Sequence, residues 1–377
     1  KDSYPNNYLN KIVRYAGNHL FINNKKIQKN RNIFIIGFGK VTPYVAKELI
    51  KIIGYKNIEK GLLISPNYKK VSFNKKILSL EGTHPTPSMV SNKSTNTLLK
   101  FVNNLSQNDI IISIVSGGGS SCLSSPISGI TIKDDINLTK LLILNSIRID
   151  HINSVRGFFS NIKNGKLARI IYPAKIFNLI VSDDPRNIIN SIGSGATVHS
   201  NITKKTVLKI LNKKKLINKI PLNMRKNLQL NINQKRLKFY NNVNNTIIFQ
   251  NKDFLINFKK NSENKKIKVI IEKNILRGDV EYAKKNFLKR LILYKNFRKS
   301  LILFGSETEV EVKNKKSKGG RVQHFGALCA KELPKIFEKY VFFGLATDGH
   351  DYTRKISGII YDEIETSKIL KKKFFYE

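Results

Sequence analysis

The sequence predicts an α/β protein with a parallel β-sheet domain followed by a smaller mixed α/β domain. Apolar runs rich in isoleucine and valine alternate with segments of helical length, and glycine, serine and acidic residues gather where those runs end. Repeated strand–loop–helix units of this kind are typical of a parallel sheet covered by helices, with ligands at the carboxyl ends of the strands. A length of 377 residues favours two domains.

The elements of the first domain follow this alternation. Short apolar runs bounded by turn residues predict strands at residues 33–37, 61–65, 77–80, 109–115 and 176–181. Longer segments with a helical spacing of apolar residues predict helices at residues 42–53, 91–105, 138–149, 160–170 and 203–211.

A polar span rich in lysine and asparagine, residues 212–245, marks the predicted boundary between the domains. We place the boundary near residue 235, which predicts a Rossmann-like domain over residues 1–235 and a second domain over residues 236–377. The second domain has predicted strands at residues 246–249, 267–271, 300–304, 307–312 and 341–346, and predicted helices at residues 278–293 and 323–333.

The formal net charge of +42 is the anomaly of the composition. Lysine, asparagine and isoleucine are abundant and tryptophan is absent, which is the pattern that A/T-rich codons produce. The basic residues are scattered along the chain with little aromatic interleaving, so we expect no specific nucleic-acid partner. The charge still favours anionic substrates.

The two cysteines, Cys122 and Cys329, lie far apart in the sequence. This spacing argues against a disulfide framework and a zinc site, and it indicates a reducing compartment, which we take to be the cytoplasm. No apolar stretch reaches membrane-spanning length, so no membrane partner is expected. The chain starts without Met and both ends look cut, so we expect a fragment of a longer protein.

The most informative segment is the loop that follows the strand predicted at residues 109–115. It contains only glycine and serine, at Ser116, Gly117, Gly118, Gly119, Ser120 and Ser121. An anion can approach successive backbone N–H groups closely there, which predicts an oxyanion or phosphate site. The alternative is a tight strand-to-helix turn without a ligand. No lysine follows the glycines, so the loop is not a Walker A motif.

Other polar residues of the first domain also follow predicted strands. His84 lies in the Pro-rich loop at residues 82–88, where it either binds substrate or orients the loop. Asp183 leaves the strand at residues 176–181 and either holds Mg²⁺ or a substrate hydroxyl, or caps the next helix. Lys40 ends a short Gly-Phe-Gly turn that lacks the third glycine of the dinucleotide fingerprint.

Two segments of the second domain carry candidate functional groups. Arg321 follows two glycines at the start of a predicted helix, where a guanidinium can clamp a phosphate or a carboxylate, or simply be exposed. Asp348 and Asp351 end a predicted strand and either bind a metal ion or form Asx turns.

The order of these segments resembles the type II glycerate kinase family, the glycerate 2-kinases whose second domain is called MOFRL. Six motifs occur in the family's order over essentially the whole chain, at residues 37–41 (GFGKV), 83–91 (THPTPSMVS), 116–126 (SGGGSSCLSSP), 152–168 (INSVRGFFSNIKNGKLA), 319–324 (GGRVQH) and 346–352 (ATDGHDY).

The resemblance implies ATP- and Mg²⁺-dependent phosphorylation of D-glycerate at its 2-hydroxyl in an interdomain cleft, giving 2-phosphoglycerate. Lys40 and Arg321 match the family's proposed catalytic pair, and Arg156 or Lys163 would neutralise the glycerate carboxylate. Other residues implied in binding are His84, Ser116, Gly117, Gly118, Gly119, Ser120, Asp183, Ser194 and Gly195. The acids that we expect to hold Mg²⁺ are Asp183, Glu307 and Asp348. A homodimer is a possible assembly.

The chain departs from the family's pattern at several positions, among them Asn187, Val322, His324 and Tyr352. It also stops before the family's C-terminal motif. An impaired, ligand-binding remnant of a kinase therefore stays open as an alternative. Hydroxypyruvate reductase, an older name in the family, ranks lower because the dinucleotide fingerprint is incomplete.

Overall fold

The structure is a computed structural model that describes residues 6–17, 19–28, 30–145, 147–184, 186–200, 202–230, 241–263, 267–310, 319–351 and 356–371. The chain forms two compact units, Lys1–Asn251 and Lys252–Glu377. The boundary predicted near residue 235 lies outside the described residues. In the described part, the strand predicted at residues 246–249 belongs to the sheet of the first unit rather than to the second.

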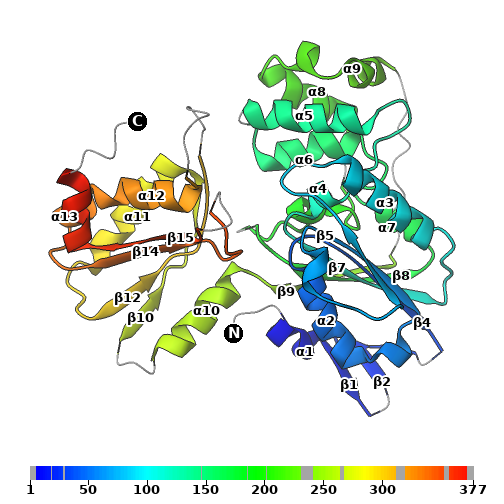
Figure 1. Cartoon of the computed structure of the whole chain (residues 1–377), viewed down its shortest axis with the longest axis horizontal. Coiled ribbons are helices and arrows are strands. Elements are labelled where there is room, and N and C mark those ends of the chain that lie inside the picture. The colour runs from blue at the N-terminus through cyan, green and yellow to red at the C-terminus, as the bar shows by residue number, and fades with distance from the viewer. Residues whose placement is uncertain are drawn as a thin grey trace. The chain divides into compact units, whose positions relative to one another are not determined.

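The first unit is built on a six-stranded parallel sheet with the order β6-β5-β4-β7-β8-β9 (Figure 1). The strands are β4 (Asn32–Phe38), β5 (Lys60–Ser65), β6 (Ile77–Glu81), β7 (Asp109–Ser116), β8 (Lys175–Val181) and β9 (Val243–Phe249). The chain runs outward from β4 to β6 and then returns to place β7 on the other side of β4. The strand order therefore reverses between β4 and β7. Sheets of this kind bind ligands beyond the carboxyl ends of the two strands at such a reversal. The predicted parallel sheet is confirmed.

Alternate residues of the central strands point into two separate hydrophobic cores. In β4, Ile35 packs into one core and Ile36 into the other, and in β7 Ile112 and Ile111 divide in the same way. Helices α1 (Asn6–Ile12) and α2 (Thr42–Ile53) cover the first face, and helices α3 (Met89–Val102) and α7 (Lys166–Ile171) cover the second. Because both faces are covered, the central strands are almost continuously apolar.

Four further helices pack on one another and form a third core in the same unit (Figure 1). They are α5 (Ile132–Leu144), α6 (Ile149–Phe158), α8 (Lys204–Lys213) and α9 (Leu222–Gln229). The predicted helix at residues 138–149 is wrong in its bounds, since Thr131 and Asp134 form a capping box that starts α5 earlier. The predicted helix at residues 160–170 shortens to α7, because Gly165 and the residue before it adopt left-handed backbone conformations.

A small antiparallel sheet, which was not predicted from the sequence, precedes β4. It consists of β1 (Val13–Ala16), β2 (His19–Ile22) and β3 (Lys25–Lys26). The short helix α4 (Gly119–Cys122) follows the glycine loop.

The second unit is smaller and mixes parallel and antiparallel pairs, as predicted. The strand pairs β10·β12 and β11·β13 are parallel, and β14·β15 is antiparallel. The strands are β10 (Lys268–Ile271), β11 (Leu276–Asp279), β12 (Ser300–Leu303), β13 (Ser306–Glu309), β14 (Val341–Leu345) and β15 (Gly358–Asp362). The helices are α10 (Asn251–Glu263), α11 (Val280–Leu291), α12 (Arg321–Ala330) and α13 (Glu363–Lys371).

An aromatic cluster holds the second unit together. The ring of Phe287 on α11 contacts Phe304, Phe325 and Phe342 in edge-on geometry, and Phe342 stacks on Tyr361. Edge-on ring pairs are the favoured arrangement for aromatic side chains. Across the described ranges, we find no helix that is both long and apolar enough to cross a membrane.

Candidate active site

The loops after β4 and β7 are joined through their backbones at the carboxyl edge of the sheet. The N–H of Lys40 donates to the carbonyl oxygen of Gly117 at 2.9 Å. Gly39 packs against Ser116 so closely that a side chain has no room there. The buried hydroxyl of Ser116 lies 3.5 Å from that of Thr42 and accepts a hydrogen bond from the N–H of Val41 at 3.4 Å. Ser116 therefore joins the two loops.

Three predicted site residues surround Gly117 and Gly118. Gly118 has a left-handed φ of 81°, and a Cβ built on it would lie 3.0 Å from Cδ2 of His84 and 3.1 Å from Cγ of Lys40. A Cβ on Gly117 would overlap the carboxylate of Asp183. The glycines thus let the side chains of Lys40, His84 and Asp183 approach one short stretch of backbone.

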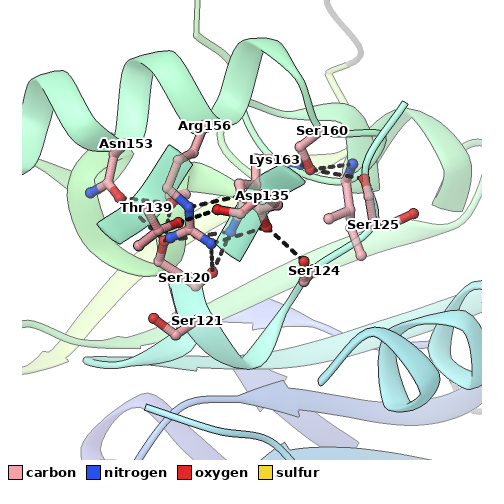
Figure 2. A network of polar contacts seen from close by, with 12 residues as sticks. Ser120, Ser121, Ser124, Ser125, Asp135, Thr139, Asn153, Arg156, Ser160 and Lys163 are labelled. Atoms are coloured by element: carbon pink, nitrogen blue, oxygen red, sulfur yellow. Dashed lines mark hydrogen bonds and ion pairs between the residues drawn. The ribbon is translucent and has the colours of Figure 1, made fainter. Parts of the chain in front are cut away.

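Ser120 is the centre of a polar network behind this loop (Figure 2). Its hydroxyl accepts a hydrogen bond from Ser194 at 2.6 Å and donates to Oδ1 of Asn153 at 3.2 Å. Ser194 has a φ of 55°, and its hydroxyl oxygen also lies 3.0 Å from Oδ1 of Asn153. The neighbouring Gly195 has a φ of 56° and accepts at its carbonyl from the N–H of Gly165. Ser194 and Gly195 therefore support the loop from within the protein.

Arg156 and Lys163 reach the same serine from α6 and the segment after it. Their exposed fractions are 3% and 1%, so both side chains are buried. Arg156 donates to the Ser120 hydroxyl at 3.0 Å, and the ammonium group of Lys163 donates to the Ser120 carbonyl oxygen. Arg156 also pairs with Asp135 of α5 at 3.2 Å (Figure 2).

Burial and opposite charge set the ionisation of this network. Burial alone would raise the pKa of Asp135, but the Arg156 guanidinium lowers it overall. Burial and the neighbouring Arg156 together hold the pKa of Lys163 well below 10.5. Burial raises the pKa of the Cys122 thiol to about 12, so this thiol stays protonated near neutral pH.

The loop after β8 separates two adjacent acids into different environments. Asp184 pairs with Arg186 at 3.0 Å and accepts a hydrogen bond from Ser191, and these partners outweigh burial and lower its pKa. Asn187 has a φ of 52° and donates through its amide to Gln250. Asp184 thus stabilises the turn, whereas Asp183 lies against the glycine loop.

In the second unit, Arg321 begins α12 and binds the carboxylate of Glu307 and, at 3.4 Å, the carbonyl oxygen of Thr308. The Glu307 carboxylate, expected to hold a metal ion, is therefore an ion-pair partner of Arg321. Asp348 accepts the N–H of His350 at 3.2 Å, as in an Asx turn. Val322 and His324 lie within α12, whereas Tyr352 lies outside the described residues.

Asp351 caps α12. Its carboxylate, 3% exposed, accepts the N–H of Val322 at 3.2 Å and the N–H and side-chain amide of Gln323 at 2.8 and 3.1 Å. Gly320 is required beside it, because a Cβ there would overlap the carboxylate. Asp351 therefore determines where α12 starts and, with it, the position of Arg321.

Replacing Asp351 with alanine is expected to lower the free energy of unfolding of the second unit by about 2–3 kcal/mol, since a buried charged cap with several donors is lost. The matched control is Asp279→Ala, because Asp279 caps α11 through the N–H groups of Glu281 and Tyr282 but is exposed. The Asp279→Ala control should lower the free energy of unfolding by about 1 kcal/mol. Urea unfolding followed by circular dichroism measures both, and an equal loss would contradict the assignment.

Within the described ranges, no three histidine, cysteine or acidic side chains gather as a metal site. Magnesium, however, is commonly held by one or two carboxylates together with substrate phosphates. Asp183 beside the glycine loop fits that donor set.

Asp135 and Asn153 were not predicted as site residues, and Asp351 was predicted as a metal ligand or an Asx-turn residue rather than as a helix cap. For Asp135 a signal was present, because Asp135, Leu138, Thr139 and Leu142 are the buried residues on one face of α5. An acid in phase with buried residues on a helix requires a buried partner. The positions of Asn153 and Asp351 depend on contacts between distant segments, which spacing alone does not reveal.

Comparison with known proteins agrees with these motifs. Residues 1–229 match the family described as "Domain of unknown function (DUF4147)", and residues 300–376 match the MOFRL family. A Glycerate 2-kinase from Picrophilus torridus is 31% identical over 349 residues, which cover 90% of this chain and 79% of that protein. A D-glycerate 2-kinase from Thermotoga maritima is 27% identical and covers 90% of this chain and 80% of its own length.

Solved structures show the same fold. A glycerate kinase from Thermotoga maritima superposes with a TM-score of 0.74 at 26% identity, covering 91% of this chain and 81% of that chain. A protein from Pyrococcus horikoshii superposes with a TM-score of 0.74 at 25% identity, covering 99% of this chain and 86% of that chain. The motifs, the two family matches and the shared fold lead to one conclusion: this chain belongs to the type II glycerate kinase family, with a DUF4147 domain followed by a MOFRL domain.

Proposed function

We propose that this protein transfers the γ-phosphoryl group of ATP to the 2-hydroxyl of D-glycerate, giving 2-phosphoglycerate and ADP. The observation that carries the proposal is the arrangement at the glycine loop, where Lys40, His84 and Asp183 meet Gly117 and Gly118. The relatives named above are glycerate kinases, which supports the same reaction class.

The groups at this loop suit phosphoryl transfer, which depends on positioning and charge stabilisation more than on covalent chemistry. The 2-hydroxyl oxygen forms a bond to the γ-phosphorus while the bond from phosphorus to the bridging oxygen of ADP breaks. Lys40 stabilises the negative charge on the transferred group. Asp183 accepts the hydroxyl proton or holds Mg²⁺, and both roles need an ionised carboxylate at its position.

We propose that the second unit supplies Arg321 to the same phosphoryl group when the two units close on their substrates. Its guanidinium has a fork geometry that suits phosphate oxygens. Glu307 would hold that guanidinium in place before substrate arrives. Mg²⁺, when bound, would neutralise phosphate charge, with Asp183 and Asp348 as the proposed ligands.

The test is a coupled assay of ADP release with ATP, Mg²⁺ and D-glycerate, with the phosphorylated position of the product assigned by ³¹P and ¹H NMR. Formation of 2-phosphoglycerate is the expected result. Binding of D-glycerate without turnover would instead indicate a non-catalytic remnant. NADH oxidation with hydroxypyruvate, without ADP release, would indicate a reductase.

Gly118→Ala is expected to lower kcat by about 10- to 100-fold, because the added methyl group would press on Lys40 and His84. The matched control is Gly129→Ala. Gly129 has a similar φ of 78°, but a Cβ there meets no atom within 4 Å. Both variants carry the same backbone strain, of about 1 kcal/mol.

Steady-state kinetics and thermal unfolding of both Gly118→Ala and Gly129→Ala separate strain from damage to the site. Equal kcat values for the two variants would show that the space beside Gly118 is not used in the reaction.

A further inference from the structure

The two cations beneath the glycine loop are too deeply buried to serve as ordinary substrate ligands. Arg156 and Lys163 direct their charged groups at Ser120, through its hydroxyl and its carbonyl oxygen. A second hydrogen bond joins Lys163 to the Ser120 hydroxyl at 3.4 Å. Both residues therefore act on the loop through Ser120, the residue that directly follows the three glycines (Figure 2).

The charges in this network do not balance. In the described part of the chain, Arg156 is paired with one carboxylate, that of Asp135, and Lys163 has no carboxylate within ion-pair distance. Asp135 is itself held by the Ser124 hydroxyl at 2.7 Å. Two buried cations with one anion leave an excess positive charge in a medium of low dielectric constant, which is costly to the fold.

A bound anion at the loop would offset that cost. Ser120 directly follows Gly117, Gly118 and Gly119, so charge placed on its carbonyl and hydroxyl lies next to the proposed phosphate site. The positive potential of buried groups is screened far less by solvent than that of surface lysines. The positive potential of Arg156 and Lys163 is therefore less screened than that of the scattered surface lysines.

We propose that Arg156 and Lys163 are positioning residues that hold Ser120 and supply an uncompensated positive charge, which increases the affinity of the glycine loop for nucleotide phosphates. This inference rests on the proposed function and deepens it. It also assigns the two residues a role other than neutralising the glycerate carboxylate.

Two variants, one that removes a buried cation and one that removes the buried anion, distinguish this electrostatic role from a merely structural one. Lys163→Met removes a buried cation and should weaken ADP binding at least about 10-fold. Asp135→Asn removes the compensating anion at nearly constant shape and should tighten ADP binding about 3-fold or more at a pH below the pKa of Lys163. A network that only supports the fold would weaken binding in both variants.

Lys166→Met is the matched control, because Lys166 lies three residues away and donates to the carbonyl oxygens of Gly157, Phe158 and Ser160 rather than to Ser120. It should lower thermal stability while leaving ADP affinity within about 2-fold of the wild type. If Lys163→Met does not fold, the comparison of Asp135→Asn with Lys166→Met still decides the question.

The pH dependence of ADP affinity gives a second readout. The titratable and charged groups around Lys163 are Arg156 of α6, Asp135 of α5 and Cys122 of α4. Burial and the charge of Arg156 lower the pKa of Lys163. ADP binding should therefore weaken as the pH rises through the pKa of Lys163. In Asp135→Asn this weakening should occur at lower pH, since Asp135 raises the pKa of Lys163.

Isothermal titration calorimetry of the full chain with ADP measures all of these effects. Opposite changes in Lys163→Met and Asp135→Asn support the inference. Weaker or unchanged binding in Asp135→Asn would overturn it while the wild type still binds ADP and turns over. If the wild type neither binds ADP nor phosphorylates D-glycerate, the proposed function itself fails.

Discussion

Replacing Lys40 with alanine should lower kcat for glycerate phosphorylation by about 10³-fold, with little change in the fold. The side chain lies beside Gly118, at the proposed phosphate site. Its backbone is held independently, because its N–H binds Gly117 and its carbonyl oxygen accepts a hydrogen bond from Asn67 at 3.0 Å. The variant therefore removes the cation without releasing the loop. Coupled kinetics with saturating ATP and D-glycerate measure the loss.

Lys47→Ala is the control for Lys40→Ala, because Lys47 is exposed on the adjoining helix α2. It removes the same charge from the same unit and should keep kcat within about 2-fold of the wild type. Comparable kcat values for the two variants would show that Lys40 has no direct role in transfer.

Arg321→Ala should lower kcat by about 10³-fold, the scale on which a guanidinium stabilises a migrating phosphoryl group. Arg321→Lys should recover only part of this loss, since an ammonium group keeps the charge but not the two-pronged geometry. The variant should leave α12 intact, because the N–H groups at its start are held by Asp351.

The control for Arg321→Ala is Arg277→Ala, an exposed arginine on β11 of the same unit. Single-turnover kinetics separate transfer from product release. If Arg321→Ala changes the KM for D-glycerate but leaves the transfer rate intact, Arg321 binds the substrate carboxylate rather than the phosphoryl group.

Several features of the fold were predictable because they depend on local pattern. The central strands β4, β5, β7 and β8 of the first sheet are buried on both faces, and this requires the near-continuous apolar runs that predict them. The strand at residues 246–249 was assigned to the wrong domain, because its pairing with β8 depends on residues nearly 70 positions apart. Such long-range pairing leaves no signal in local composition.

The candidate site, too, was predictable only in part. The motif order identified the loops that carry Lys40, His84 and Asp183, but not their approach to Gly117 and Gly118. It also did not separate Asp183 from Asp184, which pairs with Arg186. Neighbouring side chains on one loop point in different directions, and only packing determines which of them reaches the site.

The glycine loop illustrates what each level of information determined. The sequence alone predicted that Gly117, Gly118 and Gly119 follow a buried strand of a parallel sheet, because small residues and apolar runs are local properties. Only the tertiary structure decided that the buried Arg156 and Lys163 reach Ser120 of this loop and that Arg156 pairs with Asp135. Burial and charge balance are sums over segments that are distant in the sequence, so they arise only when the chain has folded.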